Sequence, residues 1–138
     1  MFDHERLEVY QRAVEVVAWA GELLDADLAR RGQSAVKQLD RASTSVPLNI
    51  AEGNGKRSSA DRARYLDIAR GSALESAACL DVLVARKLLQ TDRVLAGKSL
   101  LTRIVEMLSK LVARFAEEPS TSTSTSTRCR QRGGPRFR

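Results

Sequence analysis

The stretch from Gly53 to Ser59 has the residue types closest to those of a ligand-binding loop. Its sequence is Gly-Asn-Gly-Lys-Arg-Ser-Ser, and glycines followed by lysine and hydroxyl side chains are typical of phosphate-binding loops. The Walker spacing is absent, because Ile50 stands where a glycine is needed and Arg57 where a serine or threonine is needed. Nucleotide hydrolysis is therefore not predicted. Two interpretations stay open: a plain capped turn, or a helix start whose amides hold one backbone phosphate with Lys56 and Arg57.

Basic side chains predict an electrostatic surface for RNA or DNA in two parts of the chain. One part is the helix expected to start at Ser58, and the other is the segment 119–138, a Ser/Thr alternation followed by an arginine-rich end. Lysine and arginine bind phosphate backbones mainly through charge. The alternatives are a solvated helix face for the first part and a solubilising extension for the second. The candidate nucleic-acid-binding residues are Lys56, Arg57, Arg62, Arg64, Arg128, Arg130, Arg132, Arg136 and Arg138.

The positive charge of the chain is concentrated in the segment 119–138. The 138 residues carry 23 basic and 17 acidic side chains, for a formal charge of +6. The segment holds five arginines and no acid, so the first 118 residues are close to neutral. One copy alone is therefore expected to bind nucleic acid poorly, and linked copies are expected to gain affinity through avidity.

Other chemistry has little support in the residue types. The single histidine, His4, stands between Asp3 and Glu5, whereas a di-iron bundle needs Glu-x-x-His pairs on two helices. Cys79 lies in an apolar stretch and is expected to pack as a small hydrophobe, and Cys129 has no histidine to activate it. The sequence predicts no metal ion, no cofactor and no disulfide framework.

Four helices are expected to position these residues. Apolar side chains recur at heptad steps in four segments, and no useful length of the first 118 residues alternates with the period of a strand. The segments are residues 7–28, 36–50, 66–88 and 94–115. Pro47 predicts either a kink in the second helix or two short helices meeting near Ser45. The predicted fold is all-α, an antiparallel up-down four-helix bundle over residues 1–118 with a disordered tail over 119–138.

The first helical segment is apolar over more of its surface than a four-helix monomer needs. Beside the heptad row assigned to the core lies a second apolar row. Together the rows span roughly 200°, against the roughly 100° stripe of an ordinary surface helix. We therefore predict a homo-oligomer, with Val9, Val16 and Leu23 at its interface.

The sequence predicts a cytoplasmic protein without a membrane partner. The longest uncharged stretch of the first 118 residues is 42–51, about half the ~20 residues that a bilayer span requires. The N-terminus also lacks the basic and then apolar order of a signal peptide.

The segment 38–53 resembles a known family. Its sequence is Gln-Leu-Asp-Arg-Ala-Ser-Thr-Ser-Val-Pro-Leu-Asn-Ile-Ala-Glu-Gly, with Leu-Glu-Val-Tyr-Gln-Arg-Ala at 7–13 and Tyr-Leu-Asp-Ile-Ala-Arg-Gly-Ser at 65–72. These strings are similar to those of the four-helix-bundle proteins encoded in intervening sequences of bacterial 23S ribosomal RNA genes. The same family includes the accessory variability protein of diversity-generating retroelements.

The resemblance implies fold and assembly better than it implies function. It implies a four-helix bundle and, as in the retroelement protein, a barrel-like pentamer that binds nucleic acid and a reverse transcriptase. Most members of the family have no established activity, and the segment 119–138 lies outside the family pattern. The positions that match the family are Arg41, Ser45, Pro47, Asn49, Glu52, Gly53 and Glu75.

Two functions stay open for these matching positions. In a nonenzymatic scaffold they form a structural network, in which Arg41 pairs with Glu52 or Glu75 and the Asn49 amide satisfies backbone groups freed by Pro47. In a small enzyme of unknown reaction, Arg41, Glu52 and Glu75 form a polar cluster. A water-filled pocket at these residues would favour the enzyme, and a dry paired network would favour the scaffold, which is the function we predict.

Overall fold

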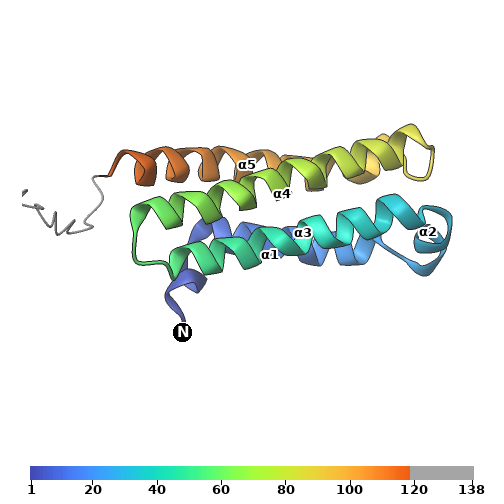
Figure 1. The fold of residues 1–138 in the computed structure, drawn as a ribbon. Helices are drawn as coiled ribbons and strands as arrows, with labels where there is room; N and C mark the ends of the chain where they lie inside the picture. Colours follow the sequence, from blue (N-terminus) through green and yellow to red (C-terminus); the bar gives the residue numbers. More distant parts are fainter. Residues whose placement is uncertain (119–138) are drawn as a thin grey trace, which may run out of the picture.

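Four long helices form an antiparallel up-down bundle in the computed structural model, which describes residues 1–118 (Figure 1). They are α1 (Glu8–Leu23), α3 (Gln33–Asn54), α4 (Ser59–Ala85) and α5 (Thr91–Glu117). A 3-10 turn, η1 (Asp3–Arg6), precedes α1, and a short helix, α2 (Ala26–Arg31), joins α1 to α3. The described residues contain no strand, so the predicted all-α bundle is confirmed. The predicted tail, 119–138, lies outside the described residues.

The four long helices occupy the corners of a square in cross-section. Helix α3 packs against α1 and α4, and α5 packs against α4 and α1, whereas α1 and α4 are not in contact. Helices α1 and α4 therefore lie at diagonal corners, and both run away from the end that holds the N-terminus (Figure 1). Consecutive helices are antiparallel because short connections join them.

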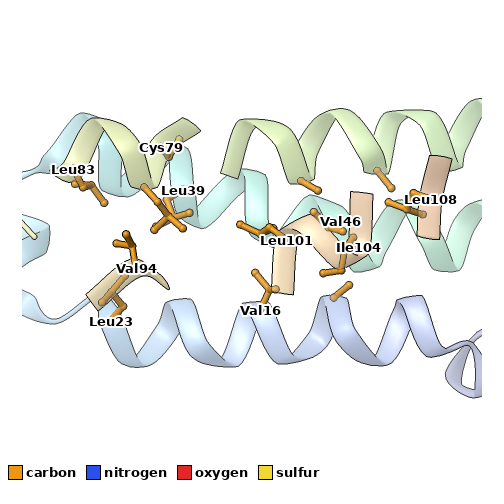
Figure 2. Packing of buried hydrophobic residues seen from close by; sticks show 14 of the residues in the cluster. Val16, Leu23, Leu39, Val46, Cys79, Leu83, Val94, Leu101, Ile104 and Leu108 are labelled. Carbon is orange, nitrogen blue, oxygen red and sulfur yellow. The ribbon is translucent and has the colours of Figure 1, made fainter. Parts of the chain in front are cut away.

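The core lies between the four helices, and Figure 2 shows part of it. The heptad rows predicted for α3 and α5 face inward, as their burial shows. These rows include Leu39, Val46 and Ile50 of α3 and Leu101, Ile104 and Leu108 of α5. Burial of these side chains removes apolar surface from water and is the main force that holds the helices together.

The structure reverses the predicted roles of the two apolar rows on α1. Val9, Val16 and Leu23, predicted at an oligomer interface, are 3%, 1% and 5% exposed and belong to the core of the monomer. Figure 2 shows Val16 and Leu23 among the core residues. The row predicted for the core faces partly outward, and Val14 in it is 43% exposed. The prediction was wrong because heptad spacing defines a row but not which of two adjacent rows the neighbouring helices cover.

The first helical segment is also not one helix. Helix α1 ends at Leu23, and Asp25 caps the start of α2 by accepting a hydrogen bond from the Leu28 amide at 2.8 Å. An aspartate at this position stabilises a helix start. Leu28 nevertheless stays buried, as its place in the heptad row predicts.

Helix α3 continues through Pro47 as one helix from Gln33 to Asn54, which excludes the two short helices. A proline within a helix removes one backbone hydrogen bond and crowds the preceding turn. Pro47 is itself buried, and α3 packs against two helices along its length. This packing offsets the lost bond, and a kink at Pro47 stays a prediction.

Candidate nucleic-acid interface

The predicted basic residues of the bundle lie at the end where α3 turns into α4. Ser58 caps α4 there, because its Oγ accepts a hydrogen bond from the Asp61 amide at 3.1 Å, which confirms the predicted cap. The Ser59 hydroxyl donates a hydrogen bond to the Glu118 carboxylate at 2.7 Å. The last described residue before the segment 119–138 therefore lies beside the start of α4.

Two of the four candidate basic residues of the bundle have contacts within the chain. Arg62 Nε donates to the Lys56 carbonyl at 2.7 Å, and the Arg62 guanidinium lies 5.5 Å from the centre of the Phe115 ring. The Lys56 ammonium lies 4.9 Å from the centre of the Tyr65 ring and 3.9 Å from the Glu52 carboxylate. Arg62 thus holds the turn between α3 and α4 closed, and Lys56 is partly neutralised.

The other two candidates, Arg57 and Arg64, extend into solvent. Both are exposed, and neither has an ion-pair partner among residues 1–118. Exposed arginines without a partner keep their hydrogen-bond donors available for phosphate oxygens. Arg128, Arg130, Arg132, Arg136 and Arg138 lie outside the described residues.

The start of α4 favours the plain capped turn over a phosphate held by backbone amides. The Ser58 side chain already occupies the Asp61 amide. The hydrogen bond from Ser59 holds the Glu118 carboxylate beside the first turn of α4. Asp61 is a second acidic residue in that turn. A phosphate at the same place would meet these two negative charges, so the side chains of Arg57 and Arg64 are the better ligands.

The cluster that an enzyme would need is divided between two places. Arg41 pairs with Glu75 across α3 and α4 at 3.5 Å, one of the two predicted pairings, and both side chains are largely exposed. Glu52 instead faces Lys56. Arg41 and Glu52 are eleven residues apart on α3, a distance of about 16 Å along a helix. The three residues form neither a shared pocket nor a dry network.

A polar contact between α3 and α4 does form beside Pro47. The Asn49 amide donates to the Ser45 carbonyl and to Ser45 Oγ, each at 2.8 Å, and Ser45 Oγ lies 2.9 Å from Ser72 Oγ. The carbonyl that Pro47 leaves without its helical donor belongs to Ser43, four residues earlier. Asn49 therefore does not satisfy the backbone carbonyl freed by Pro47, contrary to the prediction.

Ser72 was not among the residues predicted for this contact, although the sequence carries a signal for it. Small residues recur on α4 at positions three and four apart, and Ser72 among them contacts Ser45 of α3. They are Ala69, Ser72, Ala73 and Ser76. Small side chains let two helices approach closely, and Gly53 does the same on α3, where an added Cβ would lie 2.9 Å from Tyr65 Cβ.

Cys79 lines a shallow groove of about 250 Å³ between α3 and α4, together with Gln38, Glu75 and Arg86. Burial raises the pKa of the Cys79 thiol, the Glu75 carboxylate raises it further, and Arg41 lowers it. A thiol kept protonated is a poor nucleophile. Cys79 packs as a small hydrophobe, as predicted.

Two further findings concern ligands and membranes. Among residues 1–118, no group of three or more His, Cys, Asp or Glu side chains is placed to hold a metal ion. In the same part of the chain, no helix combines the length and the apolar character needed to cross a bilayer.

The fold of the chain is similar to that of a solved structure. This is the 1.70 Å crystal structure of a protein with unknown function from the S23 ribosomal protein family of Bacteroides thetaiotaomicron VPI-5482. The TM-score is 0.68 at 23% sequence identity, and the alignment covers 75% of this chain and 97% of that chain. At this identity the likeness shows a shared fold. No match was found among curated proteins.

The sequence also matches a family model. The model is that of the 23S rRNA-intervening sequence protein family, and it matches residues 5–110. This range covers more than half of the chain and contains every position from Arg41 to Glu75 that carried the resemblance. The chain therefore belongs to the 23S rRNA-intervening sequence protein family.

Proposed function

We propose that this chain is a nonenzymatic homo-oligomer that binds RNA or DNA at the end of the bundle where the segment 119–138 begins. The observation that carries the proposal is the hydrogen bond between Ser59 and Glu118. It holds Glu118, the last described residue, at the start of α4, near the exposed Arg57 and Arg64. The segment 119–138, which carries five arginines, follows Glu118 directly in the sequence.

The proposed binding is electrostatic and weakly selective for sequence. Arginines that contact phosphates release condensed counterions, so affinity falls steeply as the salt concentration rises. The rest of the bundle is close to neutral and adds little. Several copies in one assembly present several such ends, and linked weak sites raise the apparent affinity.

Replacing Arg57 and Arg64 with alanine tests the contribution of the bundle. We expect the log–log slope of affinity against salt to lose about 1.4 to 1.8 units, because each phosphate contact contributes about 0.7 to 0.9. The measurement is fluorescence anisotropy of a labelled RNA and a labelled DNA duplex over a salt series.

The matched control is the double variant Arg30→Ala and Arg31→Ala. These arginines lie on α2 at the opposite end of the bundle and pair with Asp27. The control removes the same charge and should leave the slope unchanged. An equal effect of the two double variants contradicts a localised site, and absence of binding at low salt contradicts nucleic-acid binding itself.

We extend the proposal to one protein partner, a reverse transcriptase that the oligomer assists as an accessory factor. Its support is the resemblance of residues 38–53 to the accessory variability protein. Copurification with a reverse transcriptase encoded by a neighbouring gene tests this extension. A gene without such a neighbour contradicts it.

A further inference from the structure

A pocket of about 130 Å³ lies at the end of the bundle where the N-terminus, the turn between α3 and α4 and the end of α5 come together (Figure 1). We call it the Phe115 pocket. Its apolar wall continues the core, because Leu66 belongs to the core and Leu7, Leu111 and Phe115 pack against it. Arg62 and Arg114 complete the lining. The pocket therefore joins an apolar wall to two positive charges.

The two arginines lie against the aromatic ring of the pocket. The guanidinium groups of Arg62 and Arg114 are 5.5 Å and 5.8 Å from the centre of the Phe115 ring. Arg62 is half-buried and is held by its hydrogen bond to the Lys56 carbonyl. The Arg114 side chain is 71% exposed, and its ion pair with Glu118 is long, at 3.8 Å. Arg62 is therefore fixed in place, whereas Arg114 can leave the ring.

A second aromatic surface lies beside the pocket, on η1. The Phe2 side chain is 74% exposed, and its ring stacks on His4 with 5.8 Å between the ring centres and 9° between the planes. The amide of Asn54, which lines the pocket, donates to the Asp3 carboxylate at 3.0 Å and holds η1 there. An exposed flat ring next to positive charge is typical of a surface on which bases stack.

We propose that the Phe115 pocket binds one base of a single-stranded RNA or DNA and that a second base stacks on Phe2. The inference rests on the proposed nucleic-acid binding and names the form of nucleic acid. A nucleotide combines a flat base, which stacks on aromatic rings and guanidinium planes, with an anionic phosphate. The pocket is smaller than the roughly 300–1,000 Å³ of sites for drug-sized ligands, so it has room for a single base.

The base takes the place of the Arg114 guanidinium on the Phe115 ring. A cation–π contact of an exposed arginine is weaker than the stacking of a base on an aromatic ring. The released guanidinium keeps its N–H donors free for the phosphate of the same nucleotide. Arg57 and Arg64, which are exposed at the same end of the bundle, are available to the flanking phosphates.

This arrangement distinguishes single strands from duplexes. In a duplex each base is paired and stacked between its neighbours, so it must be flipped out before it can enter a pocket. A duplex therefore meets the arginines alone and binds through charge. Because a duplex also carries more charge than a single strand of the same length, a test of the bases requires two single strands of equal charge.

Two such strands isolate the contribution of the bases. One is a labelled strand of about twelve thymidines, within the site sizes of single-strand binding proteins. The other has the same length and phosphates but is abasic at every position. We expect the chain to bind the thymidine strand more tightly, by about 5- to 150-fold for each stacked base. Fluorescence anisotropy at one fixed salt concentration measures both affinities.

Variants of the two aromatic residues assign this preference to the pocket and to η1. Phe115→Leu keeps an apolar side chain and removes the ring, so it should lower affinity for the thymidine strand by about 5- to 150-fold and leave the abasic strand unchanged. Phe115→Tyr keeps a ring and should bind as the wild type does. Phe2→Ala, at an exposed side chain, should cause the same selective loss for the second base.

Trp19→Leu is the matched control. The Trp19 ring lies against Gly97 near the start of α5, at the opposite end of the bundle from the Phe115 pocket. The control removes an aromatic ring as Phe115→Leu does, and it should change neither affinity. Circular dichroism checks the fold of every variant, and Phe115→Met replaces Phe115→Leu if the latter does not fold.

The other outcomes separate this inference from the proposed function. Equal affinity of the wild-type chain for the two strands contradicts a base site and leaves binding through charge in place. Absence of binding of either strand at low salt contradicts nucleic-acid binding itself. A preference for thymidine that survives both Phe115→Leu and Phe2→Ala contradicts the assigned residues. If Phe115→Leu leaves both affinities unchanged and alters the mass of the assembly in native mass spectrometry, the pocket receives a second copy of the chain and not a base.

Discussion

Val16→Glu should unfold the monomer, whereas Val14→Glu should leave it folded. Val16 is 1% exposed and lies in the core between α1 and its neighbours (Figure 2). A carboxylate there has no partner, and burying an unpaired charge costs several kcal/mol. That cost is comparable to the whole stability of a domain of this size, about 5 to 15 kcal/mol. Val14 is 43% exposed, so its replacement keeps the new charge in water.

Thermal unfolding followed by circular dichroism distinguishes the two variants. Val16→Glu should lose its cooperative transition, and Val14→Glu should melt near the wild-type temperature. The pair is well matched, because the same substitution is made two residues apart on one helix. If Val16→Glu were to dissociate an oligomer and still melt cooperatively, Val16 would lie at an interface between copies. Its assignment to the core of the monomer would then be wrong.

Deletion of residues 119–138 should cause the largest loss of nucleic-acid binding. The segment carries five of the 23 basic side chains and no acid. Its deletion therefore removes nearly all of the net positive charge of the chain. If all five arginines contact phosphates, the log–log slope of affinity against salt should fall by about 3.5 to 4.5 units. The loss should be greatest at low salt, where counterion release contributes most.

Two full-length variants separate charge from other properties of this segment. Replacing its five arginines with lysine keeps the charge and should keep most of the salt dependence, whereas replacing them with glutamine should act like the deletion. Tight binding that survives the deletion with the same slope places the site wholly on the bundle. A lysine variant as weak as the glutamine variant contradicts a mainly electrostatic mechanism.

Local patterns were sufficient for α3, α4 and α5, whereas the first predicted helical segment is divided into α1 and α2. Heptad spacing identified the inward rows of α3 and α5, and Ser58 marked the start of α4 through the hydrogen bond that a serine cap makes. The order and antiparallel arrangement of the helices followed from the short connections. These features depend on residues within a few turns of one another, so they are visible along the chain.

The rotation of α1 and the partners of the long side chains depended on packing between distant segments. Val9 and Val14 both belong to apolar rows, and only the positions of α3 and α5 place Val9 in the core and Val14 at the surface. Arg62 and Arg64 are both candidate phosphate ligands in the sequence, yet Arg62 turns back to the Lys56 carbonyl and the Phe115 ring. A helix pattern sets which residues share a side, and the apolar area that its neighbours can bury sets which side faces inward.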